Sequence, residues 1–99
     1  MITLYISNHF VRRIWVDGGY SVNVIFLNAL KRMNIPEAKI VKRSSMLIGF
    51  NGETKHTVGK IKLLIYIEGV KCMNHFCVIN TLSSYNVILG RPWINYMKD

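Results

Sequence analysis

The stretch Ile14-Trp15-Val16-Asp17-Gly18-Gly19 decides the fold of this chain, because an apolar run there ends in a carboxylate on a glycine turn. The chain has 99 residues and only two aspartates, Asp17 and the last residue, Asp99. One copy therefore has a single interior aspartate. Chemistry that needs a pair of aspartates would require two copies of the chain to meet across Asp17.

Composition predicts one packed domain over residues 1–99. Hydrophobic residues make up 51% of the chain and charged residues 18%, a balance typical of a folded domain. No apolar run approaches the roughly 18 residues of a membrane span. The chain starts without the charged segment and cleavage site of a secretory signal. We expect an intracellular, cytoplasmic protein without a membrane partner.

The formal net charge of +8 is compatible with a nucleic-acid partner. The thirteen Lys and Arg residues are scattered, however, with no run longer than two. No RNA-binding motif of interleaved aromatic residues accompanies them. A solvated basic surface is the simpler interpretation, and nucleic acid is not the expected partner.

Metal and histidine chemistry are not expected. Cys72, His75 and Cys77 supply three soft ligands, whereas structural zinc sites take four. We interpret the two thiols as small buried hydrophobic groups and expect no metal and no cofactor. His9 and His56 have no nucleophile in a triad pattern near them.

Hydrophobic periodicity predicts a mainly β domain with one central and one short C-terminal helix. Alternating Ile61, Leu63 and Ile65 indicate a long strand, and Asn51-Gly52 is a strong hairpin signal. Residues 37–45 could be a loop or an irregular edge strand. Imperfect alternation in residues 11–16 favours a strand buried on both faces. The predicted strands cover residues 2–6, 10–16, 46–54 as a hairpin, 60–68, 76–79 and 87–89.

The segment after the glycines has helical spacing. Ser21 is placed to cap this helix, and Asn34-Ile35-Pro36 is placed to end it. The turn at Asp17 is therefore predicted to lead from a strand into a helix. A second helix is predicted to open at Arg91-Pro92. The apolar face of the central helix is Val22, Ile25, Phe26, Ala29, Leu30 and Met33.

Three elements in order resemble those of the retropepsins, the dimeric aspartic proteases of retroviruses and LTR retrotransposons. They are Val16-Asp17-Gly18-Gly19, Ile48-Gly49-Phe50-Asn51-Gly52 and Val87-Ile88-Leu89-Gly90-Arg91. The amino-acid sequence around these elements is similar to that of the protease region of plant Gypsy-type retrotransposon polyproteins. The resemblance implies a closed β-barrel half of the acid-protease type over nearly the whole chain.

The resemblance also implies a role for each matched position. Asp17 would be the catalytic aspartate on the turn with Gly18 and Gly19, one from each copy of a homodimer. Residues Ile48, Gly49, Phe50, Asn51 and Gly52 would form the flap over a polypeptide substrate. Ile88, Leu89 and Gly90 would lie beneath the catalytic turn, and Arg91 would open the last helix.

The implied activity is endopeptidase cleavage of a retrotransposon polyprotein by water activated between two aspartates. The alternative is a catalytically inactive module of the same fold that binds or dimerises. Gly18 motivates this alternative, because the family usually has a Thr or Ser hydroxyl there to brace the two turns. Tyr20 adds to it, because the family prefers a small residue at that position.

Overall fold

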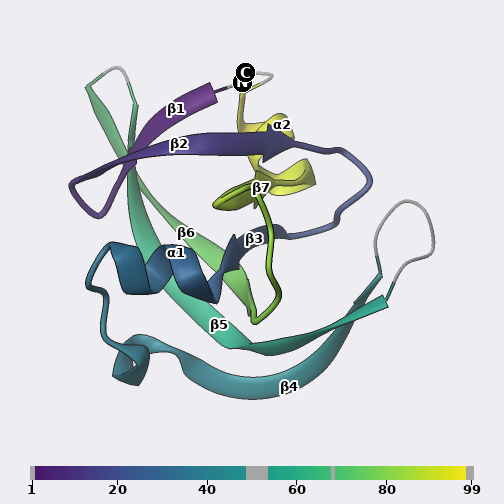
Figure 1. Ribbon diagram of the computed structural model, residues 1–99. Coiled ribbons are helices and arrows are strands. Elements are labelled where there is room, and N and C mark those ends of the chain that lie inside the picture. Colours follow the sequence, from purple (N-terminus) through teal and green to yellow (C-terminus); the bar gives the residue numbers. More distant parts are fainter. Residues whose placement is uncertain (1, 49–53, 68, 98–99) are drawn as a thin grey trace.

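The computed structural model describes residues 2–48, 54–67 and 69–97 of the chain (Figure 1). It confirms the predicted fold class, a mainly β domain with a central and a C-terminal helix. The elements in chain order are β1 (Ile2–Ile6), β2 (His9–Val16), β3 (Asn23–Phe26), α1 (Leu27–Arg32), the 3-10 turn η1 (Glu37–Lys39), β4 (Val41–Ile48), β5 (Thr54–Ile67), β6 (Val70–Ile79), β7 (Val87–Leu89) and α2 (Arg91–Met97).

Six of the strands close into a barrel. The order of hydrogen-bonded strands is β1-β2-β7-β3-β6-β5-β4, and β1 also pairs with β5. β4 therefore lies outside the ring, as an edge strand on β5 (Figure 1). Most neighbours are antiparallel, but β2 with β7 and β3 with β6 are parallel pairs. These two parallel pairs bring the segment around Asp17 against the last third of the chain.

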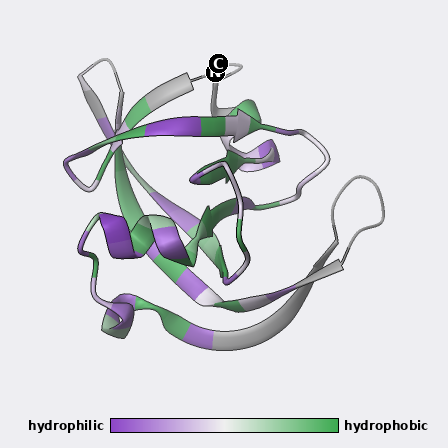
Figure 2. Cartoon of the chain, viewed as in Figure 1, coloured by the Kyte–Doolittle hydropathy of each residue, from purple (hydrophilic) through white to green (hydrophobic). Residues whose placement is uncertain are grey.

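Two hydrophobic clusters lie on opposite faces of β3. Ile25 belongs to the larger cluster, which fills the barrel and includes Ala29 and Leu30 of α1. Val24 and Phe26 belong to the smaller cluster, together with Tyr20. Successive side chains of a strand point to opposite faces, so β3 is buried on both sides. Figure 2 shows β3 and β7 as largely hydrophobic and α1 as a mixture of hydrophobic and hydrophilic residues.

The prediction of a central helix beginning after Ser21 is wrong at its N-terminus. Residues 23–26 form β3, and α1 begins only at Leu27. The residue at the N-cap is Phe26, which has an extended backbone and makes no side-chain capping bond. Pairing with β6 and β7 overrides the helical spacing of this apolar run. The turn at Asp17 therefore leads from one strand to another.

The predicted end of the helix is confirmed. Asn34 has a φ of 55°, and the backbone N–H of Ile35 donates to the carbonyl of Leu30 at 3.0 Å. An asparagine in the left-handed region commonly terminates helices in this way. Lys31 and Arg32 in the last turn complement the negative end of the helix dipole.

β2 departs from the predicted burial on both faces. Val11 and Ile14 are buried three positions apart, whereas Trp15 and Val16 are exposed. Arg13, which lies between Val11 and Ile14, has a φ of 58°, and the pairing of β1 with β2 is irregular over this region. A local bulge therefore explains the imperfect alternation in the sequence.

Of the two alternatives for residues 37–45, the edge strand is confirmed from Val41 onward, where β4 begins and pairs with β5, whereas residues 37–39 form η1. The pairing continues to Ile48 and Thr54, and residues 49–53 of the hairpin predicted over 46–54 lie outside the described residues. Gly59 allows β5 to approach β4 closely, since a Cβ there would lie 2.9 Å from Cα of Lys42. Within the described part of the chain, no helix is long and apolar enough to cross a membrane.

Candidate active site

Asp17 lies at the C-terminal end of β2, on a tight turn that is partly exposed. The backbone N–H of Gly19 donates to Oδ1 of Asp17 at 2.8 Å, and the N–H of Tyr20 donates to the Asp17 carbonyl at 3.3 Å. The first of these bonds is charge-assisted when the carboxylate is ionised. Asp17, Gly18 and Gly19 thus form one unit in which the turn itself orients the carboxylate.

The junction between β7 and α2 holds this turn from beneath. The N–H of Asp17 donates to the carbonyl of Leu89 at 2.9 Å, which extends the parallel pairing of β2 with β7. The N–H of Arg91 donates to the carbonyl of Tyr20 at 3.0 Å. Backbone bonds on either side of Gly90 therefore fix both ends of the turn. Arg91 is the first residue of α2, and its side chain is exposed.

Gly90 is a glycine because two backbone segments meet at this position. A Cβ on Gly90 would lie 2.6 Å from the carbonyl oxygen of Tyr20 and closer still to that of Val22. Distances below about 3 Å do not occur for real Cβ atoms without a shift. The absence of a side chain at Gly90 lets the chain after the turn pass directly over the β7–α2 junction.

Asn23 is a site residue that the sequence analysis missed. It is 1% exposed, and its Oδ1 accepts a hydrogen bond from the backbone N–H of Gly90 at 2.9 Å. It thereby ties β3 to the junction beneath Asp17. The available signal was a polar residue inside the apolar run Val22-Asn23-Val24-Ile25, which the helical interpretation assigned to a solvent-facing side.

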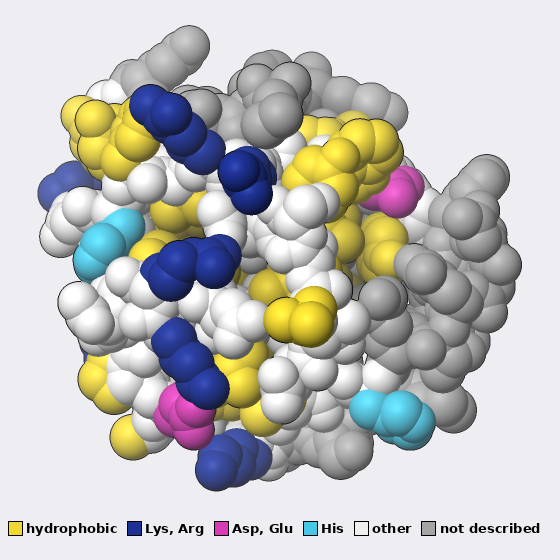
Figure 3. Space-filling model, viewed as in Figure 1, with side chains coloured by type: hydrophobic (Ala, Val, Ile, Leu, Met, Phe, Trp, Pro, Cys, Tyr) yellow, Lys and Arg dark blue, Asp and Glu magenta, His cyan; other side chains and the backbone are white. Residues whose placement is uncertain are grey.

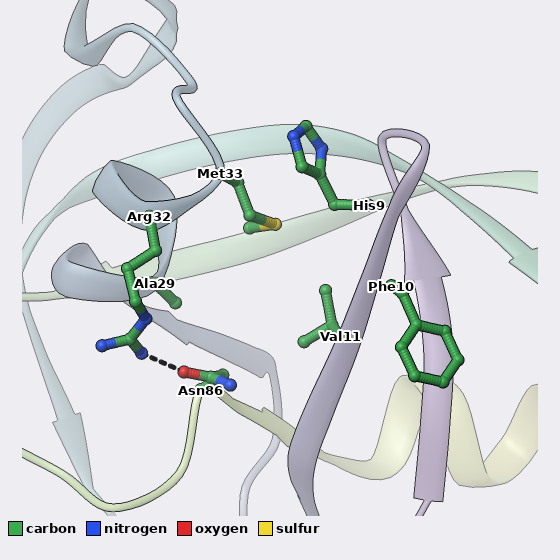
Figure 4. A pocket seen from close by; sticks show the side chains of 7 residues that line it. All are labelled: His9, Phe10, Val11, Ala29, Arg32, Met33 and Asn86. Carbon is green, nitrogen blue, oxygen red and sulfur yellow. Dashed lines mark hydrogen bonds between the residues drawn. The ribbon is translucent and has the colours of Figure 1, made fainter.

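Asn86 is a second missed residue, and it lies at the other end of β7. Its Nδ2 donates to the carbonyl of Arg12 at 2.8 Å, and its backbone N–H donates to that of Arg13 at 2.9 Å. Its own carbonyl accepts from the N–H of Phe26 at 3.1 Å, and its Oδ1 accepts from Nη2 of Arg32 (Figure 4). Asn23 and Asn86 therefore anchor the two ends of β7.

An apolar rim, formed by Trp15, Val16 and Ile94, lies beside Asp17. Trp15 is 47% exposed, and its ring centroid lies 5.2 Å from that of Tyr85. Val16 is also exposed, and Ile94 of α2 is half-buried next to Gly18. Figure 3 shows a group of hydrophobic side chains beside an acidic one near the end of β2. A carboxylate within exposed apolar surface suits contact with a second polypeptide.

Tyr20 does not occupy this rim. It is 5% exposed and packs with Val24, Phe26, Ile79 and Ile88 in the smaller hydrophobic cluster. Its large side chain is therefore accommodated within the domain. Of the residues implied in the flap, Ile48 ends β4, whereas Gly49, Phe50, Asn51 and Gly52 lie outside the described residues.

The cysteines are both free thiols, with Cys77 buried and Cys72 half-buried on β6. Burial raises the pKa of Cys77 above its ordinary value of 9.0, while the positive charge of Lys60 opposes this by a smaller amount. Among the residues that the structure describes, no three His, Cys, Asp or Glu side chains are grouped as metal ligands.

This architecture, a six-stranded barrel with two short helices, is the retropepsin-like fold. A solved structure that it resembles is the retroviral protease-like domain of Ddi1 from Leishmania major. The TM-score is 0.69 at 15% sequence identity, over 98% of this chain and 73% of that one. A likeness at this identity establishes the fold. No protein-family model and no curated protein matches the sequence.

Proposed function

We propose that this chain is a retropepsin-like aspartic endopeptidase domain that acts as a homodimer. The observation that carries the proposal is the geometry of Asp17. Its carboxylate lies on a turn that backbone bonds from β7 and α2 fix in place, within a retropepsin-like fold. Its surroundings are exposed and apolar, as a contact with another polypeptide requires.

A homodimer follows from the number of aspartates. Asp17 and Asp99 are the only two in the chain, so a second Asp17 must come from a second copy. Two such turns related by a two-fold axis would place their carboxylates side by side. Trp15, Val16 and Ile94 beside the turn supply apolar surface for this contact.

The chemistry then depends on one proton shared by two carboxylates. At a separation of about 3 Å both cannot be ionised, so the pair holds a single proton. The ionised member takes a proton from water, whose oxygen attacks the scissile carbonyl carbon, while the protonated member donates to the carbonyl oxygen. Transfer of a proton to the amide nitrogen breaks the C–N bond and yields a carboxyl and an amine product.

We propose a polyprotein of LTR-retrotransposon type as the substrate. Support comes from the resemblance of residues 16–19, 48–52 and 87–91 to the protease region of plant Gypsy-type elements. Its test is cleavage of a Gag-like polypeptide by the purified chain. No cofactor takes part in the proposed reaction.

The decisive comparison is between Asp17→Asn and Asp99→Asn. Both substitutions remove one carboxylate and change the side-chain volume equally, but only Asp17 lies on the turn. We expect Asp17→Asn to abolish cleavage and Asp99→Asn to retain it. Excess Asp17→Asn protein should also inhibit a fixed amount of wild type, because mixed dimers have one carboxylate. Cleavage that survives Asp17→Asn would refute the proposal.

Sedimentation with a statine-type inhibitor distinguishes an active protease from an inactive module of the same fold. An active site shared by two copies should bind the inhibitor and shift the monomer–dimer equilibrium toward the dimer. A chain that dimerises but neither cleaves nor binds the inhibitor would instead be the inactive binding module.

A further inference from the structure

Three aromatic side chains form a row across the outer face of the barrel, far along the sheet from Asp17. Tyr5 of β1 pairs with Phe10 of β2 and with Tyr66 of β5. The ring centroids of Tyr5 and Phe10 are 5.3 Å apart, and those of Tyr5 and Tyr66 are 6.4 Å apart. We call these three residues the aromatic row.

The aromatic row faces solvent. Phe10, Tyr5 and Tyr66 are 54%, 47% and 40% exposed, whereas Leu4 and Ile6 on either side of Tyr5 are buried. Figure 4 shows the ring of Phe10 directed away from Val11, toward β1. Neighbouring rings in a sheet stabilise each other, but these three residues remain exposed enough to contact a ligand.

A positive charge lies at each end of the aromatic row. The guanidinium of Arg12 lies 5.4 Å from the ring centroid of Phe10. Lys71 of β6 pairs with Tyr66 in the sheet register and lines a cavity of about 300 Å³ with Tyr5, Asn8 and Tyr66. The row therefore combines flat apolar faces with cations at both ends.

The strands around the aromatic row contain no acidic residue. β1, β2, β5 and β6 together carry no Asp or Glu in their sequences. Lys60 and Lys62 are exposed at alternate positions of β5, on the same face as Tyr66. The Lys and Arg residues of these four strands are Arg12, Arg13, Lys55, Lys60, Lys62 and Lys71.

We propose that the aromatic row and its flanking cations bind single-stranded nucleic acid. Bases stack on exposed aromatic side chains irrespective of sequence, and phosphates contact Lys and Arg along the path of the strand. An acidic polypeptide would match the charge but would present no flat bases to the three rings. Single-stranded nucleic acid satisfies both features, through groups that RNA and DNA share.

This proposal differs from the expectation drawn from the sequence, which found no aromatic motif among the basic residues. The aromatic row is assembled from residues 5, 10 and 66, and its cations come from positions 12 and 71. Only the pairing of β1 with β5 brings them together. A motif search along the chain examines neighbours in sequence and misses such a surface.

The first test compares four ligands of matched length or charge. We expect the chain to bind an oligo-dT strand and an oligo-U strand with similar affinity. An abasic strand of the same length and a polyglutamate of matched charge should each bind at least tenfold more weakly, because neither can stack. Equal binding of oligo-dT and the abasic strand, or of oligo-dT and polyglutamate, would overturn the proposal.

The second test removes the rings while a matched variant keeps them. Tyr5→Leu with Tyr66→Leu should weaken oligo-dT binding roughly tenfold or more, without changing binding to the abasic strand. Tyr5→Phe with Tyr66→Phe retains both rings and should bind as wild type does. Loss of affinity in the Phe pair equal to that in the Leu pair would refute stacking, and the Phe pair keeps this test valid if the Leu pair fails to fold.

The third test concerns the cations. Lys71→Gln should reduce the slope of log affinity against log salt by about 0.7, the value for one phosphate contact on a single strand. Lys39→Gln removes the same charge from the exposed turn η1 and should leave the slope unchanged. Asp17→Asn should not affect binding to nucleic acid. The outcome of this test is therefore independent of whether the chain is a protease. An identical slope change in both Lys variants would contradict the assigned position.

Discussion

The side chain of Asn23 is hydrogen-bonded to the backbone N–H of Gly90, 67 positions away in the sequence. The bond is buried, since Asn23 is 1% exposed. It connects the strand that follows the Asp17 turn to the junction that supports the turn. A single amide thus stabilises both the packing of β3 and the geometry of the candidate site.

We predict that Asn23→Ala lowers the free energy of unfolding by about 1–3 kcal/mol, because the N–H of Gly90 loses its buried acceptor. Urea denaturation measures the loss. Asn80→Ala is the control, since Asn80 is exposed in the loop after β6, and we expect less than about 0.5 kcal/mol there. Equal stability of the two variants would show that the buried bond contributes little.

Gly90→Ala should destabilise the fold by about 3 kcal/mol, because the new Cβ overlaps the carbonyl oxygens of Tyr20 and Val22. Gly18→Ala, on the Asp17 turn that this junction supports, is the matched control. Its Cβ would lie 3.6 Å from Cδ1 of Ile94, an ordinary contact. Thermal unfolding of both variants checks the contrast, and a Gly90→Ala protein as stable as Gly18→Ala would contradict the close approach.

Gly18→Ser should strengthen the proposed homodimer without disturbing the turn. The position has room for a Cβ, and its φ lies outside the left-handed region. The hydroxyl would supply the donor that the retropepsins, which the sequence resembles, usually have after the aspartate. Sedimentation equilibrium should show a lower dimer dissociation constant for Gly18→Ser than for Gly18→Ala. If the two constants are the same, the hydroxyl has no bracing role in this chain.

Trp15→Ser should weaken the proposed homodimer more than it weakens the folded monomer. We expect the dimer dissociation constant to rise at least tenfold, as for a buried aromatic residue of an interface. The loss of monomer stability should be about 1 kcal/mol, from the contact with Tyr85. Leu82→Ser is the control, because Leu82 is 87% exposed in the loop before β7. An unchanged dimer would place the interface elsewhere.

Alkylation should distinguish the two thiols. Iodoacetamide at about pH 8 should modify Cys72 well before Cys77, because burial shields Cys77 and raises its pKa, so little thiolate is present. Mass spectrometry of peptides from briefly treated native protein measures the order. Equal rates in native and unfolded protein at Cys77 would contradict its burial.

The same pKa shift predicts the direction of a pH effect on stability. The folded state retains the Cys77 proton more strongly than the unfolded state does. This contribution is fully present below 9.0, the ordinary pKa, and is lost as pH rises past it. The free energy of unfolding of wild type should therefore fall above pH 9.0 relative to that of Cys77→Ala.

Local pattern was sufficient for much of the fold. Alternation at Ile61, Leu63 and Ile65 predicts β5, and the short apolar run before Gly90 predicts β7. These strands are predictable because one face of each is buried and the other is polar, or because the run is bounded by turn residues. The turn at Asp17 is predictable because the apolar run before it is bounded by Gly18 and Gly19.

The errors came from contacts between distant segments. The run from Val22 to Phe26 fits both a helix and a buried strand, and only pairing with β6 and β7 decides between them. The role of Asn23 depends on Gly90, and the role of Asn86 depends on the bulge in β2. No feature within a few residues of either asparagine specifies its partner.

The parallel pairing of β2 with β7 has a consequence for synthesis on the ribosome. Residues 14–16 pair in parallel with residues 87–89, and the N–H of Asp17 donates to the carbonyl of Leu89, so the turn at Asp17 cannot acquire this support until nearly the whole chain has emerged. Pairing between such distant segments is slow compared with local structure. A nascent polypeptide would therefore complete translation of this domain before it could possess the assembled aspartate turn.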